Sequence, residues 1–462
     1  MTSYTFFILF IILAIGSYYI GRFRSISLAK GVGGIRNLAA LPSYYGMLSV
    51  FWAVIPAFVI LLAWTLFDEI FFTNAAFNML PETARQLPAE QLTLLMNKIG
   101  IAAREGVGAS ALEAEYLPAF EKYKSMSQKF GALKPILILL LLVIGALFSW
   151  TFISARYNAR TSIEKVIKIL LIICSCIAIL TTVGIVFSVL FESFRFFQKI
   201  PLHEFLFGTH WNPQIAIRAD QIAADGSFGA IPLFTGTLLI SAIALIIAVP
   251  TGLMAAIYLS EYASNRVRAW IKPILEILAG IPTVVYGFFA ALTVAPFVRD
   301  VGESVGLSVA SESALAAGLV MGIMIIPFVS SLSDDVINAV PQSLRDGSYG
   351  LGATQSETIR KVIFPAALPG IVGGILLAAS RAIGETMIVV MAAGLAANLT
   401  ANPLETVTTV TVQIVTLLVG DQEFDSAKTL AAFALGLLLF LVTLALNFIA
   451  LHVVKKYREQ YD

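Results

Sequence analysis

The sequence predicts an all-α membrane protein that crosses the bilayer several times. Of its 462 residues, 58% are hydrophobic and only 13% are charged, and the mean hydropathy is +0.87. Soluble domains contain roughly a quarter charged residues, so this composition is typical of a polytopic membrane protein. The net charge of +1 gives no indication of nucleic-acid binding, and two cysteines and three histidines offer little material for a metal site.

The apolar residues are grouped in long runs. A run of about 20 such residues crosses the hydrocarbon core as a helix, and nine runs are predicted as spans: 4–21, 46–67, 135–153, 167–191, 232–258, 273–298, 310–332, 368–395 and 428–452. The last six are evenly spaced and joined by short loops. We therefore expect a six-helix core at 166–452, a preceding extension at 1–165 with three spans, and a cytoplasmic tail at 453–462.

The distribution of basic residues predicts the orientation. Arg22 and Arg24 follow the first run and no basic residue precedes it. Because short cytoplasmic loops are rich in Lys and Arg, the N-terminus is expected outside and the C-terminus in the cytoplasm. The short outer loops 299–309 and 396–427 carry one basic residue between them, Arg299, which agrees with this map.

The long segment 68–134 is predicted as an outer helical insertion. LPAEQLTLLMNKIGIAAREG has apolar residues at helical spacing, and a glycine-rich break separates it from EAEYLPAFEKYKSMSQKF. The two pieces are expected to form a hairpin outside the membrane. Two interpretations remain open: a docking surface for a binding protein or accessory subunit, or a hairpin that only stabilises the extension.

A polar segment at 336–365 is predicted as two short helices around a turn. Pro341 suits a first helical position, and Gly350 and Gly352 permit a turn at positive φ. Thr354 with Glu357 forms a capping box that opens the second helix. Pro365 is expected to end that helix. The alternative is a plain connecting loop with an amphipathic helix on the membrane surface.

This segment contains no nucleotide site. GSYGLGAT has the glycine spacing of a phosphate-binding loop, but Ala353 stands where the lysine must be and no strand precedes it.

A second motif, outside this segment, resembles an enzyme site in letters only. Gly302-Glu303-Ser304-Val305-Gly306 matches the hydrolase elbow, but it joins two spans without a strand-to-helix turn. The chain is therefore predicted not to be an enzyme.

Two charged residues, Arg381 and Glu385, lie inside the eighth run. A charge at mid-span costs roughly 2.5–3.5 kcal/mol on insertion scales, and a spacing of four places both side chains on one face of a helix. One interpretation is a buried ion pair that fixes helix packing. The other is a translocation path, in which the guanidinium binds an anion and the carboxylate holds the guanidinium between passages.

Other residues near the spans have structural interpretations. Glu261 is expected to be a solvated interface residue at the end of the fifth span. Glu276 is expected to snorkel or to pair with Lys272, one turn away. Gly318 and Gly322 have the spacing of a close contact between two membrane helices.

Several motifs together resemble the PstC-type permease of the phosphate-specific ABC importer. The coupling-loop pattern of such permeases is EAA, three residues, Gly, nine residues and I-x-L-P. Its counterpart here is Asp346-Gly347-Ser348, then Gly352 and Val362-Ile363-Phe364-Pro365, with Asp for Glu and Gly-Ser for two alanines. FGAIPLFTGTLLISAIALIIAVPTGLMAAIYLSEYA, LAGIPTVVYGFFA and SRAIGETMIVVMAAG extend the resemblance over about 190–452.

The resemblance implies a multi-pass permease subunit of an ATP-driven phosphate importer in the bacterial plasma membrane. It would form half of a pore with a second, PstA-like permease, and an external phosphate-binding protein would deliver phosphate. Its coupling loop would insert into a cleft of two ATP-hydrolysing subunits, which bind ATP and magnesium, so no cofactor is expected on this chain. The family also implies that Arg381 and Glu385 matter for phosphate transport.

Three alternatives remain open. The first is a permease for another oxyanion, such as sulfate or molybdate, because one arginine does not distinguish tetrahedral anions. The second is a membrane signalling component that reports phosphate without moving it. The third, an intramembrane enzyme, is disfavoured because the sequence has no nucleophile–base pair or metal cluster.

Overall fold

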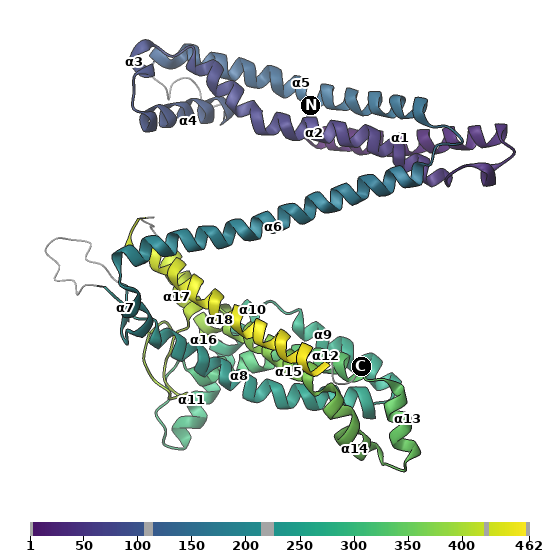
Figure 1. Cartoon of the computed structure of the whole chain (residues 1–462). Helices are drawn as coiled ribbons and strands as arrows, with labels where there is room; N and C mark the ends of the chain where they lie inside the picture. The colour runs from purple at the N-terminus through teal and green to yellow at the C-terminus, as the bar shows by residue number, and fades with distance from the viewer. Residues whose placement is uncertain (1–2, 106–113, 214–225, 420–424, 459–462) are drawn as a thin grey trace. The chain divides into compact units, whose positions relative to one another are not determined.

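The computed structural model describes residues 3–105, 114–213, 226–419 and 425–458, and the chain divides into two compact units, Met1–Leu180 and Thr181–Asp462 (Figure 1). In the described ranges, nine helices are long and apolar enough to cross a membrane. The predicted all-α polytopic fold is confirmed. The glycine-rich break at 106–113 and the last four residues of the predicted tail lie outside the described residues.

The first unit is a bundle of long helices. In chain order it contains α1 (Ser3–Gly31), η1 (Ile35–Asn37), α2 (Pro42–Phe77), α3 (Glu82–Arg85), α4 (Ala89–Glu105), η3 (Ala114–Tyr116), α5 (Leu117–Phe152) and the first half of α6 (Ala159–Lys199). The backbones of α2 and α5 touch where Gly145 lies against Trp52, since a Cβ on Gly145 would lie 2.3 Å from the Trp52 carbonyl oxygen. Small residues allow such close approach in membrane helices.

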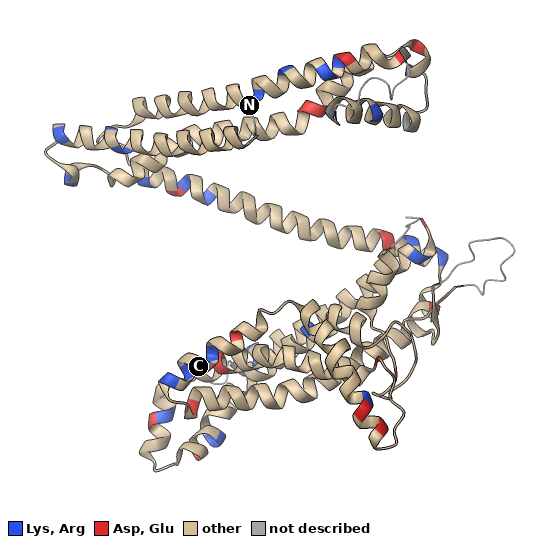
Figure 2. Cartoon of the chain, turned by 180° about the vertical axis from the view of Figure 1, so that it is seen from behind, with Lys and Arg blue, Asp and Glu red and all other residues tan. Residues whose placement is uncertain are grey.

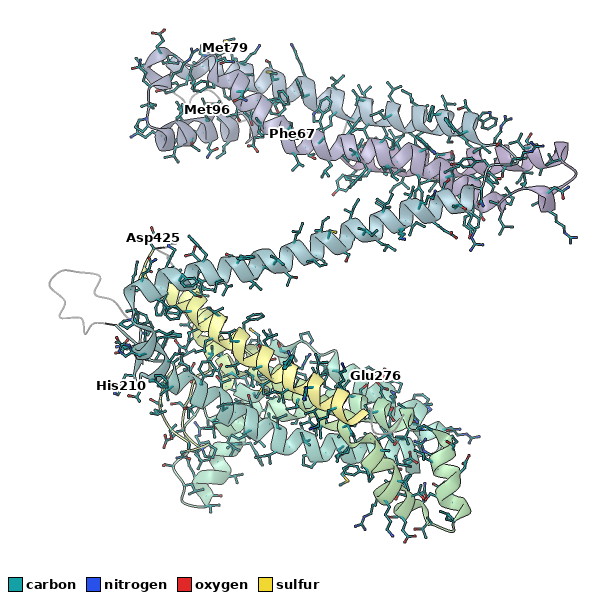
Figure 3. The ribbon with its side chains drawn as sticks, in the orientation of Figure 1. Phe67, Met79, Met96, His210, Glu276 and Asp425 are labelled. Carbon is teal, nitrogen blue, oxygen red and sulfur yellow. The ribbon has the colours of Figure 1, made fainter. Side chains whose placement is uncertain are left out.

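The insertion is an extension of the spanning helices. Because α2 and α5 each contain 36 residues, they are much longer than the roughly 20 residues that a bilayer core needs. They are joined to α4 by one buried cluster that contains Phe72, Met96, Ile99, Phe120 and Tyr123, and Figure 3 labels Met96. Both predicted helical pieces are present, and the second is the first part of α5.

The second unit contains the remaining elements. These are α7 (Leu202–Phe207), β1 (Trp211–Asn212), β2 (Ser227–Phe228), α8 (Ile231–Ile257), η4 (Tyr258–Tyr262), α9 (Asn265–Ala279), α10 (Thr283–Phe289), η5 (Ala290–Val294), α11 (Ala295–Ser304), α12 (Ala314–Ala339), α13 (Gln342–Gly350), α14 (Gln355–Thr358), η6 (Ile359–Ile363), α15 (Phe364–Ile383), α16 (Met387–Ala392), α17 (Val410–Leu418) and α18 (Ala427–Arg458). The strands form a short antiparallel pair that matches Trp211 with Phe228. The elements η4, η5 and η6 are single π-helical turns.

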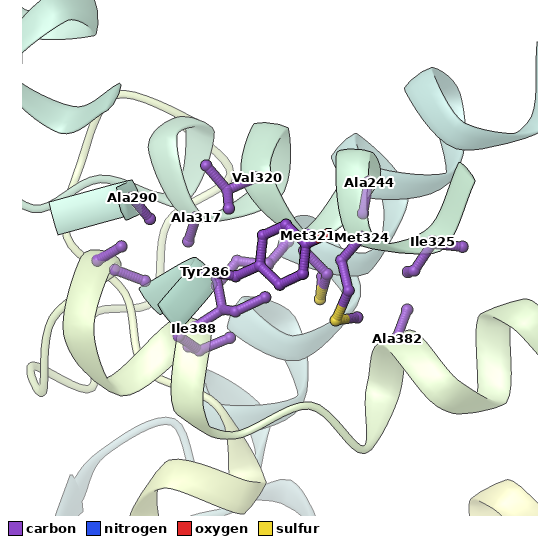
Figure 4. Close-up of a cluster of buried hydrophobic side chains, with 14 of the residues drawn as sticks. Ala244, Tyr286, Ala290, Ala317, Val320, Met321, Met324, Ile325, Ala382 and Ile388 are labelled. Atoms are coloured by element: carbon purple, nitrogen blue, oxygen red, sulfur yellow. The ribbon is translucent and has the colours of Figure 1, made fainter. Parts of the chain in front are cut away.

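The core of the second unit lies around α12. Tyr286, Met321, Met324 and Ile388 are among its buried side chains (Figure 4). A Cβ on Gly318 would lie 2.6 Å from Cγ2 of Ile243 in α8. A Cβ on Gly322 would lie 3.1 Å from the carbonyl oxygen of Ala244. The expected close helix contact at these two glycines is confirmed, and its partner is α8.

Two predicted spans are wrong in detail. The run 273–298 is interrupted, because α9 ends at Ala279 and the crossing helix begins at Thr283, after the capping residue Pro282. The run 368–395 is also interrupted, because α15 ends at Ile383 and a separate short helix follows. Both breaks lie within long, mainly apolar runs, so hydropathy alone does not resolve them. Figure 2, which colours the ribbon by residue type, shows the charged residues mainly toward the ends of the long helices.

Candidate functional site

The break after α15 separates the two charged residues of the eighth run. Ile383 is the last helical residue, Gly384 caps the helix, and Glu385 lies in the connection that leads to α16. Figure 4 labels Ala382 and Ile388 on either side of this connection. The expectation that Arg381 and Glu385 share one helical face is wrong, because the helix ends between them.

Arg381 is held against an aromatic ring. Its guanidinium carbon lies 5.8 Å from the centroid of the Phe328 ring of α12, within the range of a cation–π contact. The neighbouring Ser380 hydroxyl hydrogen-bonds the Asn447 side chain at 2.9 Å, which fastens α15 to α18. Arg381 is exposed and forms no ion pair within the described ranges. Its donors therefore remain available to an anion.

Glu385 has a different role in this structure. One carboxylate oxygen accepts the backbone N–H of Met387 at 3.0 Å and of Ile388 at 3.5 Å. The Thr411 hydroxyl donates to the backbone carbonyl of Glu385 at 2.8 Å. A carboxylate on free N–H groups satisfies donors that a helix start leaves open. Glu385 thus orders the start of α16 and the contact with α17.

A cavity of about 260 Å³ lies between α9 and α12, next to Phe328. It is lined by both apolar and polar side chains, among them Lys272, Glu276, Ser330 and Asp334. Figure 3 labels Glu276 in this part of the second unit. Phe328 lines this cavity and also contacts Arg381, so a single aromatic side chain joins the two features.

Asp334 is a buried carboxylate that binds two cations of α9. Its side chain is 4% exposed, and Nζ of Lys272 and Nη2 of Arg268 lie 2.8 Å and 3.0 Å from Oδ2. Of the two expectations for Glu276, the pairing with Lys272 is therefore wrong, and the Glu276 side chain is exposed. The hydrogen bond to Asp334 raises the pKa of the Lys272 ammonium above its usual value. The sequence carried a signal for this ion pair: Asp334-Asp335 follows the apolar run 310–332, and a basic loop follows the apolar run 232–258.

The predicted first helix of the polar segment is present as α13. Pro341 is its N-cap, one residue before the position we predicted. The Asp346 carboxylate accepts from Nε2 of Gln342 at 3.0 Å. A Cβ on Gly347 would meet open space, and the Ser348 hydroxyl hydrogen-bonds the Thr358 hydroxyl at 2.9 Å. Asp346 and Gly347 thus lie on an accessible part of the helix.

The turn after α13 depends on one glycine. Gly352 has φ +84°, whereas Gly350 remains helical, so only one of the two expected positive angles is present. The capping box between Thr354 and Glu357 is confirmed in both directions. The helix that it opens does not end at Pro365. It continues through η6 into α15, because a wider π-helical turn ends at Ile363, just before α15, and Pro365 then occupies the first turn of α15.

Comparison with known proteins gives two family matches. Residues 248–459 match the family described as "Binding-protein-dependent transport system inner membrane component". Residues 7–181 match the family described as "Phosphate ATP-binding cassette transporter". These two matches fall on the two units of the chain.

Individual relatives match more than half of the chain. A "Probable ABC transporter permease protein YqgH" of Bacillus subtilis is 32% identical over 63% of this chain and 90% of its own length. "Phosphate transport system permease protein PstC" of Mesorhizobium japonicum is 34% identical over 54% of this chain and 78% of its own length. The protein of the same name from Haemophilus influenzae is 32% identical over 63% of this chain and 92% of its own length.

Proposed function

The chain belongs to the PstC family of binding-protein-dependent transport permeases, and on this premise we propose that it is a membrane subunit of an ATP-driven importer of inorganic phosphate. It is a transport subunit and not an enzyme. Phosphate is the substrate named for its relatives. In this proposal the second unit forms half of the pore, and a second, PstA-like permease forms the other half.

The observation that carries the proposal is the position of Arg381. It is a cation in the last turn of a spanning helix, and its donors are free of carboxylates within the described ranges. A guanidinium binds phosphate oxygens through two parallel hydrogen bonds. Weak fixation by the Phe328 ring keeps the group in place without neutralising it. These properties suit a transient binding step on a phosphate path.

The segment α13–α14 supplies the contact with the ATP-hydrolysing subunits in this proposal. The docking helix is α13, and its contact residues are Asp346, Gly347 and Ser348. Gly352 makes the turn that follows α13. Pro365 lies where the second helix enters the membrane span. ATP and magnesium are bound by the partner subunits. An external binding protein delivers phosphate at the opposite end of the pore.

The proposed orientation places α9, α13 and the C-terminal end of α18 in the cytoplasm. Figure 1 shows these elements at one end of the second unit, and they carry Arg268, Lys272 and Lys455. Positive charge is concentrated on cytoplasmic loops. The N-terminus then lies outside, in a multi-pass protein of the bacterial inner membrane.

The test is uptake of radiolabelled phosphate by phosphate-starved cells with and without this chain, in the presence of excess unlabelled sulfate. Loss of sulfate-resistant uptake without the chain is the expected result. Unchanged phosphate uptake would reject phosphate as the substrate. Loss of sulfate or molybdate uptake in parallel assays would then identify another oxyanion, and loss of a phosphate-dependent transcriptional response alone would indicate signalling.

A further inference from the structure

Arg345, beside the docking residue Asp346, points back into the protein. Its side chain is 11% exposed, although it belongs to a polar helix whose other described residues are not buried. Nη1 donates to the Val340 carbonyl at 2.6 Å, and Nη2 donates to the Ile337 carbonyl at 2.8 Å. These carbonyls lie at the C-terminal end of α12, where backbone acceptors lack intrahelical partners and the helix dipole attracts a cation.

The same guanidinium binds a second span. Nη2 of Arg345 lies 3.1 Å from Oε1 of Glu261, whose side chain is 8% exposed. Glu261 belongs to η4, the π-helical turn that ends α8. The expectation that Glu261 is a solvated interface residue is therefore wrong. The guanidinium of Arg345 in α13 thus contacts the cytoplasmic ends of both α8 and α12.

Further contacts join the start of α14 to the end of α8. The side chain of Gln355, which opens α14, donates to the backbone carbonyl of Glu261. The elements α8, α12 and η6 also share one buried apolar cluster, which contains Ala256, Ile337, Ile359 and Ile363. Ile337 belongs to this cluster, and its carbonyl accepts from Arg345, so the polar contacts and the apolar packing share a residue. Movement of α13 against α8 and α12 would have to break a buried, hydrogen-bonded charge pair.

We infer that the Arg345–Glu261 ion pair makes the docking helix α13 move as one body with the ends of α8 and α12, so that motion of the ATPase reaches these spans. This inference rests on the proposed function. Arg345 is a positioning residue here, because it touches neither substrate nor nucleotide. Asp346 and its neighbours contact the ATPase, and Arg345 passes the displacement inward.

The experiment uses the full importer, purified with its partner subunits and reconstituted in liposomes with the binding protein. The quantity measured is phosphate imported per ATP hydrolysed. Arg345→Met keeps an apolar stem but loses all three contacts, and we expect this ratio to fall by about fivefold or more, the lower range of energetic coupling between distant sites. Glu261→Gln keeps an acceptor oxygen for Arg345, so its ratio is expected to fall less.

Arg266→Met is the matched control. Arg266 is an exposed basic residue of α9, close in sequence to Glu261, and it has no ion pair in the part of the chain that the structure describes. Its ratio is expected to equal that of the wild type. An equal fall in Arg266→Met would overturn the inference, because loss of any nearby positive charge would then explain the effect.

An unchanged ratio in Arg345→Met would also overturn it. Where Arg345→Met yields no assembled complex, Glu261→Gln decides the question, and an unchanged ratio in that variant assigns the ion pair to folding alone. Failure of the proposed function is distinguishable from both results. In that case the wild-type complex hydrolyses ATP but imports no phosphate.

Discussion

Arg381 and Glu385 show what a spacing argument can and cannot establish. The sequence correctly marked both as charges in an apolar region, since each is costly in a membrane. The step from spacing to pairing assumed an unbroken helix, and the break at Gly384 removes that assumption. Glu385 finds backbone donors at the start of α16 instead. Local sequence contains no direct signal for this exchange of partners.

Replacement of Arg381 is expected to separate transport from assembly. Arg381→Gln should lower phosphate uptake by about tenfold or more, because a hydrogen bond to a charged group contributes about 1.5–3 kcal/mol. Arg381→Lys should retain part of the uptake, since a lysine keeps the charge but loses the two-pronged geometry. The amount of assembled complex should not change, because Arg381 is exposed and its described contact is the Phe328 ring. Loss of the complex would instead indicate a structural role.

Gly236 permits a close backbone contact that no other residue permits. A Cβ at this position would lie 2.2 Å from the Thr408 carbonyl oxygen. Gly236→Ala is therefore expected to force α8 from the segment before α17, at a cost of about 1–3 kcal/mol. The measurement is the thermal unfolding midpoint of the purified complex in detergent. Gly436→Ala, where a Cβ meets open space in α18, should leave it unchanged, and equal midpoints for both variants would contradict the packing argument.

Helices and turns in this chain were predictable where a short pattern specifies them. The capping box at Thr354 and the turn at Gly352 require only a few neighbouring residues. The continuation through Pro365 was not predictable in this way. A proline usually ends a helix because its ring clashes with an earlier carbonyl, and here the wide turn η6 precedes it. Tertiary packing of Ile359 and Ile363 accompanies that turn.

The turn between α13 and α14 is expected to require glycine. Gly352 has φ +84°, and a side chain in this left-handed region costs roughly 1–2 kcal/mol. Gly352→Ala should therefore loosen the docking helix and reduce the amount of ATPase that co-purifies with the chain. Gly350→Ala is the control, because Gly350 is helical and a Cβ there meets open space. Reduced co-purification of both variants would exclude the backbone angle as the cause.

The arrangement into an extension and a core was predicted from span spacing and loop length. The structure gives compact units at Met1–Leu180 and Thr181–Asp462. The ion pairs Arg345–Glu261 and Lys272–Asp334 join residues 84 and 62 positions apart. Single-sequence patterns act over a few residues, so they marked the basic loops but did not identify these partners. Helix positions therefore follow from the sequence far better than the contacts between helices.

The second unit is expected to transport without the first. Its buried clusters are formed by its own residues, and YqgH is covered over 90% of its length by 63% of this chain. A chain that starts at residue 159 keeps all of α6 and should still bind the ATPase and import phosphate. A chain that starts at residue 201 should fail to assemble, because it loses Phe196, a fully buried side chain packed against Phe205 and Phe228. Both truncated chains are checked by the amount of ATPase that co-purifies with them and by their phosphate uptake. Failure of the longer chain alongside a working full-length protein would show that the extension is part of the transport machinery.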